Sequence, residues 1–180
     1  MAKTSSFLIL FCCFFTISCI TDEVIQVDIS EQRLYLVKNN QISASYPISS
    51  SSFGEGQIEN SYKTPLGKHF IKEMIGEDAN KDTIFISRIN TKRTAKIIKK
   101  PVDTEDDFVT SRIMWLGGME EGLNKGGNVD SYKRYIYIHG TQEEGLIGSK
   151  ASHGCIRMFN NDVIDLFAKV NIGTKVLIIE

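Results

Sequence analysis

The sequence predicts a mainly β protein, with β-sandwich-like mixed sheets and one helix that follows Cys155. Short stretches in which apolar residues alternate with polar ones recur from residue 24 onward, separated by turn residues. One stretch near the C-terminus instead has apolar residues at i, i+3, i+4 and i+7, the spacing of an amphipathic helix. A chain of 180 residues, 42% of them hydrophobic and 24% charged, has a globular composition and can form one domain.

The expected strands begin directly after the N-terminal segment. EVIQVDI (23–29) largely alternates, and RLYLVKNNQISASYPIS (33–49) predicts two strands joined by a turn at Asn39-Asn40. We therefore expect the globular part to open with a β-hairpin. Further strands are predicted in HFIKEMI (69–75), TIFISRI (83–89), RYIYIHG (134–140) and TKVLIIE (174–180).

Two segments depart from the strand pattern. Residues 96–133 show no clear period and are punctuated by glycines, so we expect a long loop that is functional or mobile. A helix is expected after Asn160 and Asn161, either of which could cap it, and Gly173 lies just past its end. Its apolar positions are Val163, Leu166, Phe167 and Val170.

Residues 1–20 have the three-part plan of a secretory signal peptide. The apolar run FLILFCCFFTI (7–17) is too short for a comfortable membrane span, and small or polar residues follow it. TISC, ending at Cys19, resembles the lipobox of bacterial lipoproteins, in which case Cys19 would be lipidated. Ordinary cleavage near residues 18–21 and a buried N-terminal helix are the alternatives. We expect export to the periplasm or cell envelope, with anchoring through Cys19 left open.

The charge distribution argues against a nucleic-acid partner. A formal net charge of -1 gives no electrostatic footprint for nucleic acid. The basic run RINTKRTAKIIKK (88–100) is followed at once by the acidic stretch DTEDD (103–107). We interpret these two stretches as a solvated surface segment rather than a binding patch.

The placement of the cysteines points to one reactive thiol. Of the four, Cys12 and Cys13 lie in the apolar run and Cys19 at its edge, which leaves Cys155 alone in the globular part. A disulfide framework and a metal site of several cysteines are thereby excluded. Because a lone thiol in an oxidising compartment is liable to oxidation, we predict a nucleophile, with a small buried hydrophobe as the alternative.

Two histidines could stabilise the thiolate of Cys155. His153 stands two residues before it, and His139 ends a predicted strand, a common origin for a catalytic base. Gly154 would let neighbouring N–H groups converge on an oxyanion. A zinc site formed by these side chains and His69 is a third interpretation, although no compact ligand pair of the usual spacing is present.

Polar residues on either side of the thiol could complete its pocket. The candidates are Ser152, Arg157 and Asn160. The guanidinium of Arg157 is suited to binding a carboxylate bidentately, so we expect Ser152 and Arg157 to contact substrate.

HGTQEEGLIGSKASHGCIRMFNNDVIDLF (139–167) closely resembles the signature of the L,D-transpeptidase catalytic domain, also called the YkuD-type domain. The family pattern is a strand-end His-Gly, a loop with Ile-Gly, then Ser-His-Gly-Cys, a small apolar residue, Arg or Asn, and a helix. TPLGKHF (64–70) resembles the family's Thr-Pro-x-Gly-x-Phe segment, and VDISEQRLYLVKNNQ (27–41) its opening hairpin. The similarity spans residues 24–180 and implies the family's catalytic fold.

The resemblance implies a cysteine acyltransferase that acts on peptidoglycan without a metal or diffusible cofactor. Cys155 would attack the bond between the third residue of a stem tetrapeptide, typically diaminopimelate, and D-Ala. His139 would be the general base and acid, held by the carbonyl of Gly140. The N–H groups of His153, Gly154 and Cys155 would form the oxyanion hole. The thioester would pass to an acceptor amine, giving a 3→3 cross-link between stem peptides or attachment of an envelope protein.

Other outcomes remain open for the same acyl-enzyme. Water as acceptor would make an L,D-carboxypeptidase, and a free D-amino acid would give exchange. A non-catalytic cell-wall binding protein that retains the fold is the alternative from another class. The family carries a lid over the acyl pocket, and the resemblance places Trp115, Tyr132 and Tyr135 near it, with Trp115 and Tyr132 as candidate substrate contacts.

Overall fold

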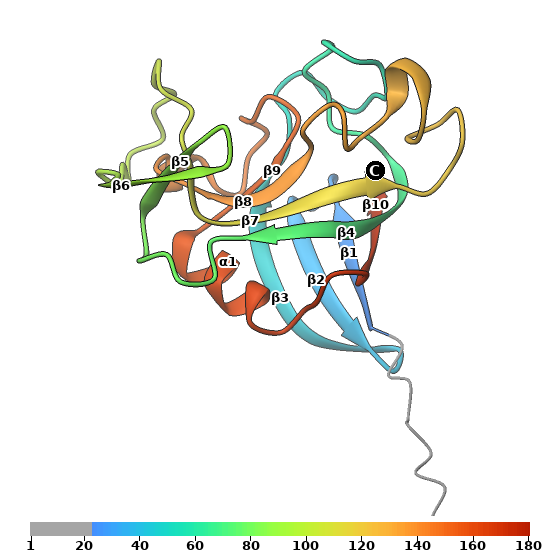
Figure 1. The fold of residues 1–180 in the computed structure, drawn as a ribbon, viewed down its shortest axis with the longest axis horizontal. Helices are drawn as coiled ribbons and strands as arrows, with labels where there is room; N and C mark the ends of the chain where they lie inside the picture. Colours follow the sequence, from blue (N-terminus) through green and yellow to red (C-terminus); the bar gives the residue numbers. More distant parts are fainter. Residues whose placement is uncertain (1–22) are drawn as a thin grey trace, which may run out of the picture.

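The computed structural model describes residues 23–180 (Figure 1). The expected signal peptide and Cys19 lie outside these residues, so both stay predictions. Within the described part, no helix has the length and apolar character needed to cross a membrane.

The strands form one mixed sheet that closes on itself. β10 pairs in parallel with β1 and antiparallel with β4. β4 pairs again with β7, so the ring runs β4-β10-β1-β2-β3-β9-β8-β7 and returns to β4. The β5–β6 hairpin stands outside this closure and extends from the first residues of β7 (Figure 1). The predicted mainly β class is confirmed, and the expected layers are two sides of one curled sheet. The elements are β1 (Glu23–Asp28), β2 (Arg33–Lys38), β3 (Gln41–Ser49), β4 (Gly67–Ile75), β5 (Thr83–Ile86), β6 (Ile89–Thr94), β7 (Val109–Gly118), η1 (Gly127–Val129), β8 (Tyr137–Thr141), η2 (Glu144–Leu146), β9 (Ile156–Met158), α1 (Asn160–Phe167) and β10 (Lys175–Ile179).

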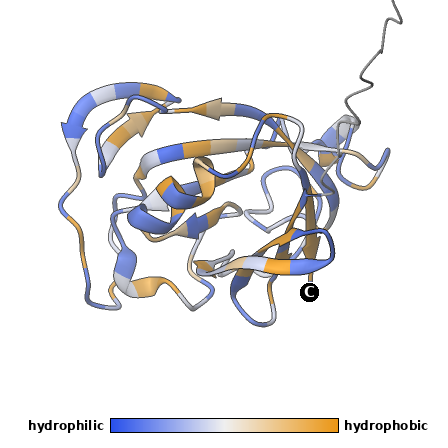
Figure 2. Cartoon of the chain, turned by 90° about the horizontal axis from the view of Figure 1, so that it is seen from below, coloured by the Kyte–Doolittle hydropathy of each residue, from blue (hydrophilic) through white to orange (hydrophobic). Residues whose placement is uncertain are grey.

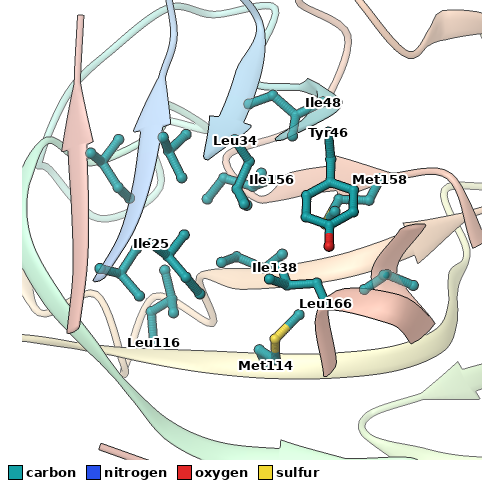
Figure 3. Packing of buried hydrophobic residues seen from close by; sticks show 14 of the residues in the cluster. Ile25, Leu34, Tyr46, Ile48, Met114, Leu116, Ile138, Ile156, Met158 and Leu166 are labelled. Carbon is teal, nitrogen blue, oxygen red and sulfur yellow. The ribbon is translucent and has the colours of Figure 1, made fainter. Parts of the chain in front are cut away.

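The main hydrophobic core lies inside the closed sheet. Side chains from β1, β2 and β3 face those from β7, β8 and β9 across it (Figure 3). Burying each of these side chains contributes roughly 1.5–3 kcal/mol relative to leaving it exposed. The core residues labelled in Figure 3 are Ile25, Leu34, Tyr46, Ile48, Met114, Leu116, Ile138, Ile156, Met158 and Leu166.

The predicted helix is confirmed as α1, which follows β9, but it ends at Phe167, so Val170 and Gly173 lie beyond it. It carries both hydrophobic and hydrophilic residues (Figure 2), and Val163 and Leu166 are fully buried against the sheet. The predicted capping by Asn160 or Asn161 is wrong, because the N-cap position is Phe159. A carboxylate from another segment replaces the cap: Glu144 Oε1 accepts the Asn160 N–H at 2.9 Å.

The prediction of one irregular segment over 96–133 is wrong for β7. This strand is buried along most of its length, so it lacks the polar alternation by which a half-exposed strand is recognised. Its two glycines, which suggested a loop, are instead required by close packing. A Cβ on Gly117 would lie 2.8 Å from Phe70, and one on Gly118 would lie 1.9 Å from the carbonyl oxygen of Asn124.

The other strand predictions hold with shifted ends. The stretch 83–89 is not one strand, because the chain turns at Ser87 and Arg88 between β5 and β6. The stretch 134–140 becomes strand only at Tyr137. The hairpin predicted around Asn39-Asn40 is the β2–β3 pair.

Candidate active site

Strand pairing places His139 and Cys155 on the same face of the sheet. β8 and β9 are parallel, with Ile138 opposite Ile156, and both of these isoleucines point into the core. Since side chains alternate along a strand, Tyr137, His139 and Cys155 lie on the opposite face. The alternation within RYIYIHG thus separates core residues from site residues.

Cys155 is half-buried, and its sulfur makes two hydrogen bonds. Sγ accepts the N–H of Tyr137 at 3.3 Å and donates to the carbonyl of Tyr135 at 3.3 Å. Burial raises the pKa of the Cys155 thiol to about 12, and the Tyr137 N–H offsets only part of this. The resting nucleophile is therefore a neutral thiol that needs a base.

His139, on the same face of the sheet, is the candidate for that base. Its side chain is 2% exposed, and Nδ1 lies 2.7 Å from the carbonyl oxygen of Gly140. Because a carbonyl oxygen only accepts, Nδ1 carries the proton and Nε2 is left unprotonated. Burial lowers the pKa of His139 to about 4, against the opposing effects of Asp107 and the Gly140 carbonyl. The imidazole is thus neutral and able to accept a proton at neutral pH.

The turn before Cys155 is held by Ser152. The Ser152 hydroxyl donates to the Cys155 carbonyl at 2.6 Å and accepts the Gly154 N–H at 3.3 Å. Gly154 has φ 119, where an added Cβ would lie 3.3 Å from the carbonyl oxygen of Lys63. Among the described residues, the N–H groups of His153 and Cys155 donate to no protein acceptor. These two are the donors free to meet an oxyanion.

Arg157 forms a buried ion-pair cluster beside the two catalytic candidates. Its 1% exposed side chain lies 2.9 Å from Glu143 and 2.6 Å from Asp107, measured nitrogen to oxygen. The same Asp107 oxygen lies 3.0 Å from Nδ1 of His153. Ser152 and Arg157, both expected to contact substrate, thus bond to groups of the protein itself.

The Asp107 carboxylate links this cluster electrostatically to the imidazole of His139. Burial raises the pKa of Asp107, but the charges of Arg157 and His139 and the hydrogen bonds from Arg157 and His153 outweigh burial and hold it below its ordinary value. The ionised carboxylate in turn raises the pKa of His139. Asp107 therefore favours the protonated imidazole that forms when His139 takes a proton.

Four rings form an aromatic wall beside Cys155: Trp115, Tyr132, Tyr135 and Tyr137. Trp115 stacks on Tyr132 with ring centroids 4.1 Å apart, and its Nε1 donates to the Tyr132 carbonyl at 3.0 Å. Tyr135 and Tyr137 lie 5.5 and 5.4 Å from Trp115. Cys155 packs against this cluster. Since Trp115 belongs to β7, its ring is part of a strand rather than of a loop.

A cavity of about 250 Å³ lies at the segment that contains Arg134 and Tyr135. Tyr62, Arg134, Tyr135 and His153 contribute to its lining. The positive charge of Arg134 acts on Cys155, lowering the pKa of the thiol against the larger effect of burial. A larger hollow of about 640 Å³ lies between α1 and β4 and contains none of the predicted site residues.

The third histidine is separate from the other two. His69 is fully buried, with Nε2 2.9 Å from the Ser131 hydroxyl and Nδ1 3.0 Å from the Gly67 carbonyl. Across residues 23–180, no three His, Cys, Asp or Glu side chains come together in a way that could hold a metal ion.

Two charged residues at the site were missed by the sequence analysis. Asp107 and Arg88 both lie in stretches interpreted as solvated surface; Asp107 is exposed and Arg88 half-buried, but each also makes a contact at the site. Asp107 pairs with Arg157, and Arg88 lies 4.7 Å from the ring centroid of Trp115. No sequence pattern could have identified them, because the pairing of β5 with β7 positions the segment of Arg88, and contacts of residues 98 and 104 with the end of β8 position that of Asp107.

Comparison with known proteins gives one family. The model of the L,D-transpeptidase catalytic domain, YkuD, matches residues 22–178. YcfS of Escherichia coli K12, named as an L,D-transpeptidase, is 28% identical over 159 residues, which is 87% of this chain and 44% of that protein. YkuD of Bacillus subtilis 168 is 45% identical over 60 residues, 31% of this chain and 37% of that protein. The chain spans less than half the length of these curated relatives.

Solved structures share the fold. L,D-transpeptidase 3 of Mycobacterium tuberculosis, in complex with a faropenem-derived adduct, superposes with a TM-score of 0.53 at 17% identity, covering 89% of this chain and 61% of that one. The Ldtfm-avibactam carbamoyl enzyme gives a TM-score of 0.53 at 19% identity, over 88% of this chain and 49% of that one. At these identities the likeness establishes the fold alone.

Proposed function

Because this chain belongs to the L,D-transpeptidase catalytic-domain (YkuD-type) family, we propose that it is an exported cysteine transpeptidase of peptidoglycan. The acyl donor is a stem tetrapeptide, cleaved between its third residue and D-Ala. The acceptor is the amine of another stem peptide or of an envelope protein. Export rests on the signal-like pattern of residues 1–20.

In the acylation step, His139 Nε2 removes the thiol proton while Sγ of Cys155 bonds to the scissile carbonyl carbon. The resulting oxyanion accepts hydrogen bonds from the N–H groups of His153 and Cys155. The imidazolium then gives its proton to the leaving amine of D-Ala as the C–N bond breaks. A thioester on Cys155 remains.

The second step reverses these roles. The acceptor amine attacks the thioester carbonyl and loses a proton to His139, and the thiolate leaves and regains that proton. The Gly140 carbonyl keeps Nδ1 protonated throughout, so Nε2 stays available for each transfer. Asp107 stabilises the imidazolium that exists between the two transfers.

One observation carries the proposal. The thiol and a neutral imidazole of fixed tautomer lie on one face of two adjacent parallel strands, with two free N–H groups at the turn before the sulfur. A buried hydrophobic cysteine needs none of these groups. The arrangement supports acyl transfer rather than binding alone.

We expect Cys155→Ala to abolish acylation with folding intact, because the sulfur is the atom that forms the thioester. His139→Ala should slow acylation by roughly 10²–10⁴-fold, the usual effect of losing a positioned acid–base group. Intact-mass measurement after incubation with a defined tetrapeptide detects the thioester, and circular dichroism checks folding.

An adduct on the Cys155→Ala protein would overturn the proposal, as would sacculus binding without turnover that is indifferent to thiol alkylation. Product analysis then identifies the acceptor. Cross-linked dimers indicate transpeptidation, whereas tripeptide alone indicates hydrolysis and incorporated D-amino acid indicates exchange.

A further inference from the structure

We propose that Arg88, at the tip of the β5–β6 hairpin, binds a carboxylate of the acyl donor beside Cys155 and so determines donor specificity. The inference rests on the proposed function, because it names a group of the proposed substrate. Arg88 is the residue of the hairpin that reaches over the aromatic wall (Trp115, Tyr132, Tyr135 and Tyr137).

The backbone at the hairpin tip indicates that the position of Arg88 is enforced. Ile86 pairs with Ile89, so the turn consists of Ser87 and Arg88 alone. Both have positive φ, 48 and 69, as a two-residue hairpin turn of this type requires. Asn-Gly or Asp-Gly normally occupies such a turn, because a Cβ is disfavoured there. Two residues with side chains at these positions suggest that contacts elsewhere hold the turn.

Those contacts lie on the aromatic wall. The guanidinium carbon of Arg88 lies 4.7 Å from the ring centroid of Trp115 and 5.1 Å from that of Tyr135. Nη1 donates to the hydroxyl of Tyr137 at 3.3 Å. Cation–π contacts of this kind fix the plane of the guanidinium while leaving its edge free to donate.

The charge of Arg88 is not neutralised within the described residues. No Asp or Glu of residues 23–180 lies within ion-pair distance of its guanidinium, whereas buried Arg157 holds two carboxylates. Glu73 acts on it only through space, and the Glu73 carboxylate already accepts the hydroxyl of Tyr132. Arg88 therefore presents unused N–H donors and a full positive charge at the wall.

The wall connects Arg88 to the reacting sulfur. The backbone N–H of Tyr137 donates to Sγ of Cys155, and the hydroxyl of the same tyrosine accepts from Arg88. A peptide acylating Cys155 has its neighbouring groups over these rings. In a tetrapeptide donor the terminal carboxylate of D-Ala lies one residue, about 3.8 Å of chain, beyond the scissile bond. Diaminopimelate offers a second carboxylate on its side chain, so either could reach the guanidinium.

A tethering role is the competing explanation. If Arg88 only held the hairpin against the wall, its loss would slow acylation by every donor equally. If Arg88 instead binds a carboxylate, removing it slows acylation only by donors that carry that carboxylate. The test is therefore a ratio of rates between charged and neutral donors rather than a single rate.

The experiment uses four tetrapeptides: both carboxylates free, D-Ala amidated, the diaminopimelate side chain amidated, and both amidated. Acylation is followed by intact mass for the wild type and for Arg88→Met, which keeps the stem and removes the charge. We expect one amidation to slow the wild type by about 10- to 100-fold, as for loss of a charged hydrogen bond. Arg88→Met should be acylated at similar relative rates by charged and amidated donors. The amidation that slows the wild type but not Arg88→Met identifies the carboxylate that Arg88 binds.

Arg93→Met is the matched control, because it removes one positive charge from the same hairpin at an exposed position on β6. It should keep the wild-type ratios, whereas Arg88→Lys should keep only part of them because lysine lacks the planar fork. The inference would be overturned if Arg88→Met kept the wild-type preference for charged over amidated donors, as it would if all four donors acylated it more slowly by the same factor. Thermal unfolding of each variant checks the fold.

A second measurement separates this inference from the proposed function. If no tetrapeptide acylates the wild type, the proposed donor is wrong, but alkylation of Cys155 still tests Arg88. Anionic iodoacetate and neutral iodoacetamide are compared in rate. Arg88→Met should lower the iodoacetate-to-iodoacetamide ratio by about threefold or more relative to Arg93→Met, through loss of local attraction for an anion. An unchanged ratio would count against Arg88 as an anion-binding residue.

Discussion

At the scale of single residues, Cys155 and His139 rest as a neutral pair. Burial raises the pKa of the thiol to about 12 and lowers the pKa of the imidazole to about 4. Between these values a thiolate–imidazolium pair is the less stable form, because both charges would be desolvated. In the proposed reaction the proton would therefore move when substrate binds, and the free N–H groups of the turn would stabilise the new negative charge.

This neutral pair predicts the pH dependence of thiol alkylation. A raised pKa keeps the folded thiol protonated above the pH at which a free thiol ionises. The iodoacetamide rate should therefore rise about tenfold per pH unit from pH 7 to 10 without a plateau. The same protein in denaturant should level off above about pH 8.5, the ordinary thiol pKa. Intact-mass time courses measure both, and a plateau of the folded protein near pH 6–7 would mean a preformed ion pair.

The two central candidates could be proposed from the sequence because their positions carry local signals. Cys155 is isolated by cysteine counting, and His139 was expected at a strand end but lies in the middle of β8, whose alternation fixes its face. Arg88 and Asp107 carry no such signal, since a charged residue in a charged stretch has the pattern of solvated surface. The true environment of Arg157 also depends on partners distant in sequence, which composition does not reveal.

At the scale of elements, residues 95–108 form a strap across the end of β8. The backbone of Ile98 bonds to Gln142 at 2.8 Å and accepts from Gly145 at 2.9 Å. The Thr104 N–H donates to Glu143 at 2.6 Å. A Cβ on Gly145 would lie 2.1 Å from the carbonyl of Lys100, so the strap lies tightly on this turn. These contacts hold Asp107 where its charge acts on the imidazole of His139.

We expect Asp107→Asn to slow acylation by about 10-fold, because a nearby carboxylate no longer stabilises the imidazolium of His139. Asp107 raises the pKa of His139, so its removal lowers that pKa further. The acid limb of the rate profile should therefore move to lower pH while the plateau falls. Stopped-time acylation assays across pH measure both.

The neighbouring Asp106→Asn is the control for this change. Asp106 is exposed, and its backbone carbonyl, rather than its carboxylate, accepts hydrogen bonds from the side chains of Thr104 and Gln142. Asp106→Asn should leave the pH dependence of the acylation rate unchanged. If Asp107→Asn lowers the plateau without moving the acid limb, Asp107 merely holds the strap in place.

β7 shows why whole elements can escape prediction. Alternation of polar and apolar residues marks a strand with one solvent-exposed face. β7 instead has neighbouring strands on both edges and is buried on both faces. Its glycines fill places where Phe70 and Asn124 approach the backbone, which only the assembled sheet creates. By contrast, β1, β2, β3 and β10 alternate and were located from the sequence to within a few residues.

At the scale of the whole molecule, closure of the sheet depends on β10. This last strand lies between β1, its parallel partner, and β4, so it joins the start of the chain to the middle. Two of its side chains, Val176 and Ile178, pack into the core and are each 1% exposed. The sequence predicted the strand but not its neighbours, because pairing partners distant in the chain leave no local pattern.

Deleting residues 175–180 should therefore prevent a stable fold. The deletion leaves β1 and β4 as open edges and exposes the core that Val176 and Ile178 cover, which favours aggregation. Removing Glu180 alone is the control, since this exposed residue follows the strand. Thermal unfolding followed by circular dichroism should give a cooperative transition for the control and none for the larger deletion, which should also elute as aggregate in size-exclusion chromatography. A monomeric, cooperatively unfolding deletion variant would show that the sheet is stable without closure by β10.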